Sequence, residues 1–238
     1  MNTRVYDEKI NINYESTKSF WATRAGENVS LKSVLLGVDK KDDAQEKRNK
    51  KELEILTSFL KKGSKYKILD IGCGIGRWAD NLKNIIENYI GIDYTKPFVD
   101  FANNRFSNNK NINFKCMSAS DIDLKITGND FNLVLCTGVL MYINDRDLDK
   151  VFSTLQATKS DYFYIQETIS VMDTRLTLNN FESKELKTNY SAIYRTKAEY
   201  EEYFKKHNLE ILDTNLFLDD ETGGRKETNA RYWLLKRG

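Results

Sequence analysis

Between residues 67 and 166, short apolar runs alternate with segments in which apolar side chains recur at helical spacing. The helical spacing is clearest at residues 148–155, where apolar side chains fall on one face. Another predicted helix begins at Thr95 and has Pro97 in its first turn, where a missing N–H costs nothing. This alternation is typical of an α/β protein whose mainly parallel sheet is covered by helices on both faces. Five strands are predicted in this region, at residues 68–71, 88–93, 112–116, 131–136 and 162–166.

The last part of the chain predicts a different kind of connection. Residues 197–207 have the pattern of a helix, and residues 209–218 and 230–236 have the pattern of strands. Only a polar loop joins these two strands, so they must pair antiparallel. We therefore expect a doubly wound, mostly parallel sheet that an antiparallel C-terminal strand completes.

Two segments interrupt this regular pattern, one ahead of the core and one after its fifth strand. Both have weak periodicity and several aromatic residues, which is typical of segments that cover a binding site. The core itself is predicted to begin with a helix that ends at Gly63. The predicted organisation is an N-terminal lid at residues 1–40, a ligand-binding core at 41–167, a cap at 168–196 and a C-terminal part at 197–238 that completes the core.

Composition narrows the class of protein. The 238 residues include 37 Lys and Arg against 35 Asp and Glu, a net charge of +2, so the overall field attracts a polyanion such as RNA only weakly. The longest apolar stretch, residues 131–143, is interrupted by Asn132 and Thr137 and is too short for a membrane span. Residues 1–9 lack the apolar core of a signal peptide. We expect a cytoplasmic globular protein.

Side chains that commonly bind metals are scattered along the chain. Cys73, Cys116 and Cys136 lie in or beside apolar runs, and we interpret them as small, reduced core residues. The sequence has no cluster of Asp, Asn and His that suggests a magnesium site. We therefore expect neither a disulfide nor a bound metal.

The strongest local signal is a glycine-rich turn after the first core strand. Gly72, Gly74 and Gly76 form this turn, which lets a ligand approach the backbone closely. Their spacing is one residue tighter than in a dinucleotide-binding turn, so a dehydrogenase is the less favoured interpretation. Asp70 precedes the turn, and a carboxylate there disfavours a pyrophosphate but suits an ammonium or sulfonium group. The predicted ligand is cationic at this point.

Acidic residues follow the next two strands. Asp93 ends the second strand, where a carboxylate can accept both hydroxyl protons of a ribose. Asp121 follows the third strand, where a carboxylate can accept from an exocyclic adenine amine. Each acid alone is typical of a turn, but their succession at neighbouring strand ends favours a nucleoside site at this edge of the sheet.

These motifs together resemble those of class I S-adenosylmethionine-dependent methyltransferases, over residues 66–166 and the two C-terminal strands. The resemblance implies a seven-stranded Rossmann-like sheet with an antiparallel last strand, and S-adenosylmethionine as the cofactor. It also implies a set of cofactor contacts. These are Gly72, Cys73 and Gly74 at the methionine part, Asp93 at the ribose with Tyr94 beside it, the Asp121 side chain and the packing or backbone of Ile122 at the adenine, and the backbone of Cys136 and Thr137 near the sulfonium.

A second resemblance lies outside this core. Residues 20–24, 74–79 and 190–195 resemble parts of methyltransferases from bacterial capsule and lipopolysaccharide gene clusters. This resemblance implies O-methylation of a sugar, or of a phosphate-bearing precursor, of a surface polysaccharide. Small-molecule N-methylation, methylation of RNA and a non-catalytic cofactor-binding partner subunit are the alternatives, and the balanced charge disfavours RNA.

Candidates for catalysis follow the fourth and fifth strands. Methyl transfer from a sulfonium is an in-line displacement, which needs a base only if the nucleophile arrives protonated. Glu167 ends the fifth strand and is a candidate base, although a carboxylate there can also cap a turn. Tyr142 is a candidate acid or base, or a packing residue over the pocket. His207 continues an apolar helical stripe, and we interpret it as packed at a helix C-terminus.

The predicted cap contributes two tyrosines and two arginines. Tyr190 and Arg195 are candidates for contact with the acceptor, together with Tyr194 and Arg175. Arginines and tyrosines in this combination are suited to a phosphate or sugar-phosphate oxyanion. The alternative for the arginines is a surface position.

The N-terminal segment contributes residues that are predicted to close over the cofactor. These are Trp21 and Arg24, with Tyr14 ahead of them. Arg24 is the predicted partner of the methionine carboxylate, and a plain surface salt bridge is the alternative.

Overall fold

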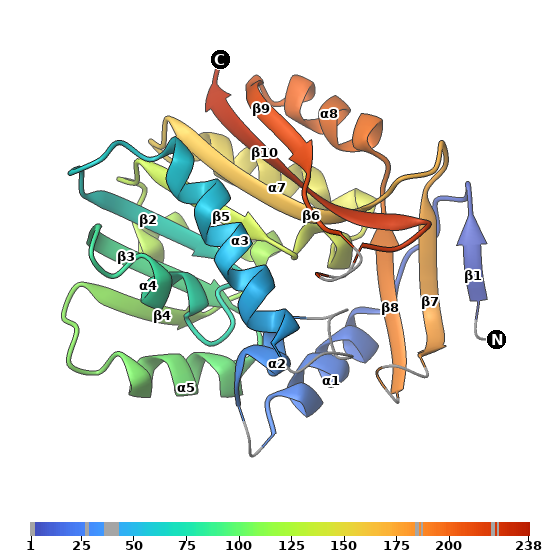
Figure 1. Ribbon diagram of the computed structural model, residues 1–238, viewed down its shortest axis with the longest axis horizontal. Coiled ribbons are helices and arrows are strands. Elements are labelled where there is room, and N and C mark those ends of the chain that lie inside the picture. The colour runs from blue at the N-terminus through green and yellow to red at the C-terminus, as the bar shows by residue number, and fades with distance from the viewer. Residues whose placement is uncertain are drawn as a thin grey trace.

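A seven-stranded sheet lies at the centre of the computed structural model, which describes residues 3–26, 29–35, 43–183, 186, 188–219, 222 and 224–238. The strand order is β4-β3-β2-β5-β6-β10-β9 (Figure 1). The strands are β2 (Tyr66–Ile71), β3 (Ile86–Asp93), β4 (Ile112–Cys116), β5 (Leu133–Thr137), β6 (Tyr162–Ser170), β9 (Leu209–Leu216) and β10 (Thr228–Arg237).

The pairing of the strands confirms the fold expected from the sequence. Strands β2 to β6 form parallel pairs, and β10 pairs antiparallel with both β6 and β9. The final strand of the chain is therefore inserted between two strands that precede it. Because β2, β3 and β5 run in the same direction, their carboxyl ends meet at one edge of the sheet (Figure 1).

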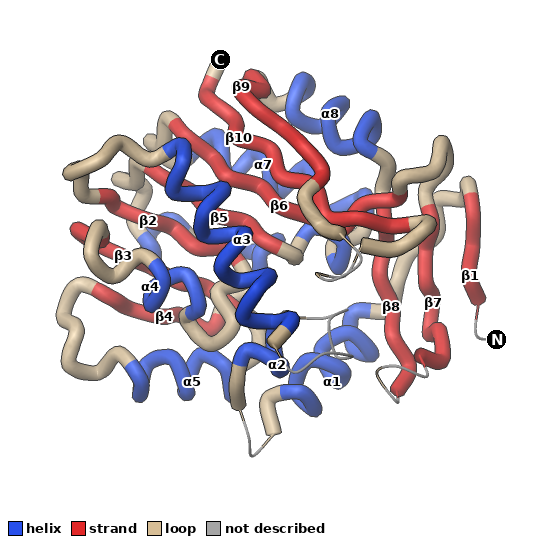
Figure 2. The backbone as a smooth tube through the Cα atoms, viewed as in Figure 1, coloured by secondary structure: helices blue, strands red, loops and turns tan. Residues whose placement is uncertain are grey.

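Helices cover both faces of this sheet (Figure 2). Ile68 of β2 packs with α3 and α4 on one face, whereas the next residue, Leu69, packs with α7 and α8 on the other. This division follows from the alternation of side chains along a strand. The helices are α3 (Ala44–Phe59), α4 (Arg77–Asn81), α5 (Lys96–Arg105), α6 (Leu124–Thr127), α7 (Asp145–Ala157) and α8 (Lys197–Lys206), with short 3₁₀ turns η1 (Ala119–Asp121) and η2 (Leu140–Tyr142).

Residues predicted to form an irregular cap instead form most of a second, smaller sheet. Its strands are β1 (Thr3–Tyr6), β7 (Leu176–Ser183) and β8 (Thr188–Tyr194), in the antiparallel order β1-β7-β8. The sequence pattern missed β8 because its last five residues are all buried, so apolar and polar positions do not alternate. Strand β7 is interrupted by a register shift between Leu178 and Phe181, which also breaks its period.

The N-terminal segment contains α1 (Tyr14–Arg24) and α2 (Leu31–Val34), although weak periodicity predicted irregular structure there. Helix α1 buries only Thr17 and Phe20, which is too few side chains to produce an amphipathic stripe. The boundary predicted between residues 40 and 41 lies outside the described residues and stays a prediction, as do the other segment boundaries.

Two side chains fasten this segment to the start of α7. The side-chain amide of Asn144 accepts from the Ile12 N–H at 2.8 Å and donates to the Ile12 carbonyl at 3.1 Å. The Tyr14 hydroxyl donates to Asp147 at 2.7 Å and accepts from the Asn144 N–H at 2.9 Å. These four hydrogen bonds place α1 across the edge of the sheet where β2, β3 and β5 end (Figure 1).

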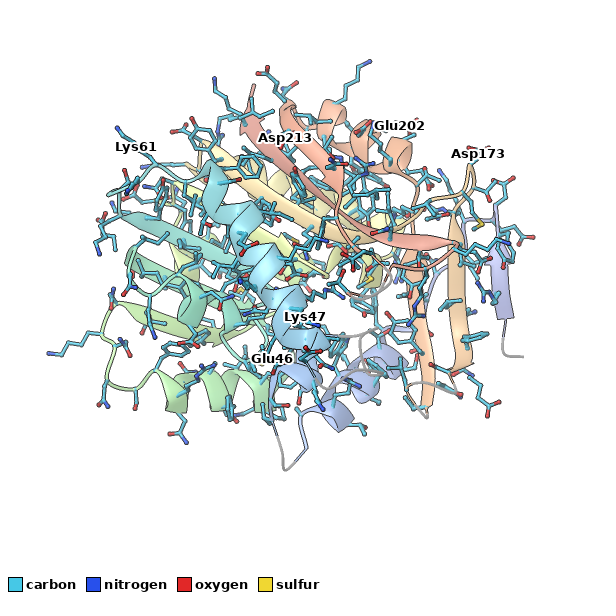
Figure 3. The ribbon with its side chains drawn as sticks, in the orientation of Figure 1. Glu46, Lys47, Lys61, Asp173, Glu202 and Asp213 are labelled. Carbon is cyan, nitrogen blue, oxygen red and sulfur yellow. The ribbon has the colours of Figure 1, made fainter. Side chains whose placement is uncertain are left out.

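Charged side chains such as Lys61, Asp173, Glu202 and Asp213 are exposed at the periphery of the molecule (Figure 3). Among the described helices, none is both long and apolar enough to cross a membrane.

Replacement of Tyr14 by phenylalanine is expected to lower the free energy of unfolding by about 1–2 kcal/mol, because it removes one donor and one acceptor from the contact with α7. Chemical denaturation measures this difference. Tyr162→Phe is the matched control, since the Tyr162 side chain is 44% exposed. Equal changes in both variants would contradict the role assigned to the Tyr14 hydroxyl.

Candidate active site

A cavity of about 210 Å³ lies at the carboxyl ends of β2, β3, β5 and β6. Its walls come from the loops after these strands, from α1 and α3, and from the smaller sheet. Open α/β sheets bind their ligands at this edge, where the loops after neighbouring strands separate. The predicted glycine turn and several of the predicted site residues line this cavity.

The turn after β2 presents bare backbone to the cavity. Gly72 and Gly74 have φ of +73° and +53°, conformations that L side chains rarely adopt. A Cβ atom at Gly72 would lie 2.1 Å from Val139, and one at Gly74 would lie 2.9 Å from Val34. No larger residue fits at either position without displacing a neighbour. Cys73, between them, also lines the cavity.

Asp93 ties this turn to the end of β3. One carboxylate oxygen accepts from the Gly74 N–H at 3.0 Å, and the other accepts from the Thr95 N–H at 2.7 Å. Burial raises the pKa of Asp93. The adjacent Tyr94 hydroxyl is buried and has no hydrogen-bond partner among the described residues, although Tyr94 lines the cavity. A ligand with polar atoms at this place would satisfy that hydroxyl.

Asp70, the acid ahead of the turn, lies beneath the cavity and does not line it. Its side chain is fully buried and accepts a hydrogen bond from the Tyr89 hydroxyl. Burial raises the pKa of Asp70 to about 7, although the Tyr89 hydrogen bond and Arg77 act in the opposite direction. The Asp70 side chain therefore lies inside the protein and is bound by Tyr89.

The residues after β5 differ in their access to the cavity. Thr137 lines it, and its hydroxyl accepts from the Trp78 indole N–H at 3.0 Å. Cys136 is fully buried in the core below and does not line the cavity. The contact expected of Cys136 was through its backbone, so burial of the side chain leaves that prediction open.

The residues predicted to contact the adenine lie in the loop after β4. Asp121 is exposed, and Ile122 packs against the core; neither lines the cavity. Met117 and Ala119, which lie between β4 and Asp121, do line it. The adenine contacts of Asp121 and Ile122 therefore stay a prediction.

Arg24 does not reach the cavity as predicted for a partner of the methionine carboxylate. Its guanidinium donates to the backbone carbonyls of Ser33 and Lys32, next to α2. Two other arginines, Arg48 and Arg77, line the cavity beside the glycine turn. They are the cationic groups in this wall that suit a carboxylate.

A buried glutamate holds these two arginines. Glu52 is fully buried on α3, and its carboxylate lies 2.8 Å from Arg48 Nε and 2.6 Å from Arg77 Nη1. It also accepts from the Gln166 side chain at 2.8 Å. Burial raises the pKa of Glu52, but Arg77 and Arg48 together hold it below its usual value. Sequence reasoning missed Arg48, Glu52 and Gln166; the i, i+4 spacing of Arg48 and Glu52 on a predicted helix was the available signal.

Aromatic side chains form the opposite wall. The hydroxyls of Tyr142 and Tyr190 lie 2.7 Å apart, and Tyr194 lines the same part of the cavity. Trp21 of α1 packs edge-on against Tyr142, with ring centres 5.5 Å apart. Burial raises the pKa of both Tyr142 and Tyr190 well above the usual value, so both hydroxyls stay protonated near neutral pH. The structure thus brings four predicted residues together, from three distant parts of the chain.

The side chains of Glu167 and Arg195 form hydrogen bonds with other groups of the protein. The Glu167 carboxylate accepts from the N–H groups of three successive residues, 139 to 141, and burial raises its pKa to about 7. Arg195 is fully buried, binds Asp145 and does not line the cavity. Arg175 binds Asp145 and Glu199 and is likewise absent from the cavity wall. Direct contact of either arginine with an acceptor does not fit this arrangement.

His207 lies outside the cavity, at the C-cap of α8, and its ring nitrogen is 3.0 Å from Asp149. This position agrees with a packed histidine at a helix terminus. Within the described part of the chain, no group of three or more His, Cys, Asp and Glu residues is arranged to hold a metal ion.

The match to a family model agrees with this geometry. Residues 68–158, which span β2 to the end of α7, match the model described as a methyltransferase domain. The fold is that of S-adenosylmethionine-dependent methyltransferases: a structure of one from Leishmania major has a TM-score of 0.69 and 19% identity, over 94% of this chain and 82% of that one. The segment from β2 to the end of α7 is thus similar to a methyltransferase domain, and it lies within a fold that S-adenosylmethionine-dependent methyltransferases share.

Curated relatives that resemble the chain include several phosphoethanolamine N-methyltransferases. The wheat enzyme, phosphoethanolamine N-methyltransferase 1, is 24% identical over 226 residues, covering 92% of this chain but 44% of the relative. The solved structure of phosphoethanolamine N-methyltransferase 1 from Haemonchus contortus, in complex with phosphoethanolamine and S-adenosylhomocysteine, has a TM-score of 0.70 and 16% identity over 94% of this chain and 48% of that one. The chain spans less than half the length of these two relatives.

The residues around the cavity fit S-adenosylmethionine. The bare turn admits the methionine part, Asp93 provides a carboxylate at the end of β3, and the unsatisfied Tyr94 hydroxyl provides a polar contact. Arg48 and Arg77 supply positive charge for the methionine carboxylate.

Asp93→Ala is expected to weaken binding of S-adenosylhomocysteine by about 1.5–3 kcal/mol, because it removes charge-assisted hydrogen bonds from the ligand and from the turn. Isothermal titration calorimetry measures the change. Asp173→Ala is the matched control, since that carboxylate is exposed and outside the cavity wall. An unchanged affinity in Asp93→Ala would refute its role in cofactor binding.

Asp70→Asn is expected to change how stability depends on pH. In the folded protein the pKa of Asp70 is about 7, above the ordinary value of 3.8, so the folded state keeps this proton where the unfolded state loses it. The Asp70 contribution to the free energy of unfolding therefore falls as pH rises from about 4 to 7 and is constant above. Denaturant titrations should show the stability difference between variant and wild type shifting by more than about 1 kcal/mol over that range, in favour of the variant at the higher pH. Parallel curves would contradict the raised pKa.

Proposed function

We propose that this protein transfers the methyl group of S-adenosylmethionine to a small acceptor that bears a phosphate group. The observation that carries the proposal is the paired hydroxyls of Tyr142 and Tyr190, 2.7 Å apart in a cavity that the glycine turn also lines. Phosphoethanolamine is the first acceptor to test.

The hydroxyl cluster suits a phosphate because its members are protonated hydrogen-bond donors. Hydrogen bonds from hydroxyls to ionised oxygen are short and about twice as strong as neutral ones. Positive charge also lines the cavity, from Arg48 and Arg77 on one side and Arg225 near the C-terminal strand. A phosphate-bearing acceptor would gain from this field as well as from direct contacts.

The aromatic rings around the hydroxyls suit the other end of such an acceptor. Phe20 and Tyr142 pack against Tyr190 with ring centres 5.2 Å and 6.1 Å away, and Trp21 packs against Tyr142. Ring faces attract an ammonium group, and a methylated ammonium more so because it is weakly hydrated. A small phosphorylated amine therefore satisfies both features of this wall.

The relatives support the same class of acceptor. Phosphoethanolamine is the substrate in the names of the plant relatives and the ligand in the Haemonchus contortus structure. Low identity and partial coverage of those proteins make the acceptor a proposal for this chain.

The chain's own residues have to align the acceptor and exclude water. When bound, S-adenosylmethionine supplies a methyl group on positively charged sulfur, to which the acceptor atom forms a bond as the carbon–sulfur bond breaks and S-adenosylhomocysteine leaves. The tyrosine hydroxyls orient the acceptor by its phosphate, and Trp21 of α1 closes the cavity from the N-terminal side. Alignment of this kind supplies much of the rate enhancement in a displacement reaction.

A narrower acceptor, the sugar or phosphate-bearing precursor of a surface polysaccharide, was expected from the sequence. Neither the family model nor the relatives described above point to polysaccharide synthesis. Its phosphate-bearing form falls within the proposed class, and a neutral sugar does not.

Turnover with purified protein and labelled S-adenosylmethionine tests the proposal. Phosphoethanolamine is expected to accept methyl groups, and ethanolamine, without the phosphate, is expected to do so at least tenfold less efficiently in kcat/KM. A phosphorylated sugar and its neutral parent form a second pair, and mass spectrometry of the products identifies the methylated atom. Cofactor binding without turnover on any acceptor would favour a non-catalytic partner subunit, and equal rates with neutral acceptors would refute the phosphate preference.

Tyr190→Phe is expected to raise KM for the phosphate-bearing acceptor by about tenfold or more, because it removes a donor to an anionic oxygen. The affinity for S-adenosylhomocysteine should stay within about twofold of wild type, measured by calorimetry. Tyr162→Phe again provides the exposed control. An unchanged KM in Tyr190→Phe would argue against the hydroxyl cluster as the phosphate site.

A further inference from the structure

We infer that Glu167 and Arg195 are positioning residues, which hold the turn at residues 139–143 from two sides and so fix the Tyr142 hydroxyl against Tyr190. This inference rests on the proposed function, because it concerns the acceptor wall of the same cavity. From the sequence, Glu167 was a candidate base or a turn cap, and Arg195 was a candidate for contact with the acceptor or a surface residue.

Glu167 holds the amide side of the turn. One carboxylate oxygen accepts from the Val139 N–H at 2.9 Å and the Leu140 N–H at 2.8 Å, and the other accepts from the Met141 N–H at 3.3 Å. The side chain is 1% exposed. These three donors occupy the carboxylate, which explains why it is tolerated in a buried position. A residue so engaged is poorly placed to take a proton from an acceptor.

Arg195 holds the carbonyl side of the same turn. Its guanidinium donates to the Leu140 carbonyl at 2.9 Å and to the Ile143 carbonyl at 2.7 Å. Asp145 accepts from the same guanidinium at 2.6 Å and at 2.9 Å, and completes its neutralisation. The planar group of an arginine can serve three acceptors at fixed angles, which a lysine cannot do.

The two side chains come from different sheets. Glu167 belongs to β6 of the seven-stranded sheet, and Arg195 directly follows β8 of the smaller sheet. Five backbone groups between residues 139 and 143 are therefore fixed by two separate parts of the fold. Tyr142 lies inside this turn, and its hydroxyl meets Tyr190 of β8 at 2.7 Å. The turn thereby sets the distance between the two hydroxyls.

A buried carboxylate and a buried guanidinium are costly unless their partners are in place. Such partners can be spread over several separate elements of a fold. The contacts of Glu167 and Arg195 instead converge on one short turn that carries a cavity-lining side chain, which is what a positioning role requires.

Glu167→Gln and Arg195→Lys test the inference. The glutamine retains one acceptor oxygen but turns its amide N–H toward the Met141 N–H, and the lysine cannot reach two carbonyls and Asp145 together.

Hydrogen exchange measured by mass spectrometry is expected to become at least tenfold faster in the peptide that contains residues 139–143. Affinity for S-adenosylhomocysteine, which reports correct folding, should stay within twofold. Glu54→Gln and Arg146→Lys are matched controls, because their side chains are 65% and 68% exposed.

A double-mutant cycle with Tyr142→Phe separates positioning from other roles. If Glu167 acts through the Tyr142 hydroxyl, the loss in kcat/KM caused by Glu167→Gln becomes smaller once that hydroxyl is absent. The inference would be overturned if Glu167→Gln lowered kcat/KM by the same factor with and without the Tyr142 hydroxyl. Unchanged hydrogen exchange in either Glu167→Gln or Arg195→Lys would also overturn it. If the wild-type protein methylates no phosphate-bearing acceptor, the proposed function fails, and hydrogen exchange alone decides whether the two residues hold the turn.

Discussion

The lack of side chains at Gly72 and Gly74 is the constraint on which the cavity depends. Both residues have positive φ, and a Cβ atom at either would collide with Val139 or Val34. Because Val139 begins the turn that Glu167 holds, the two halves of the cavity meet at this contact. The glycine turn and the turn at residues 139–143 are therefore packed directly against each other.

The buried charged side chains near the cavity lie beside side chains of opposite charge. Glu52 holds Arg48 and Arg77 beside the glycine turn, whereas Asp145 neutralises Arg195 behind the tyrosines. Each buried charge has an oppositely charged or hydrogen-bonded partner, as the cost of desolvation demands. The arginines that the sequence assigned to the acceptor thus stabilise the fold, and those on α3 and α4 line the cavity.

The sequence predicted the large sheet well because its signals are local. Buried strands, the glycine turn and the acid at Asp93 each depend on a few neighbouring residues, and the structure contains all of them. The smaller sheet was missed for a physical reason: β8 is buried along five successive residues, and β1 lies far from β7 in the sequence. The partner of Arg24 was predicted wrongly because its long side chain can reach several groups. In the structure its guanidinium donates to backbone carbonyls of α2.

The amino-acid sequence by itself determined the class of fold and the glycine turn that lines the cavity, because periodicity and glycine spacing act over short stretches of chain. The tertiary structure decided which other residues line that cavity. Tyr142, Tyr190 and Trp21 come from three segments that only packing brings together. The side chains of Glu167 and Arg195, in contrast, form hydrogen bonds with backbone groups. A side chain's role depends on which neighbour satisfies its polar atoms, and in this protein those neighbours are distant in the sequence.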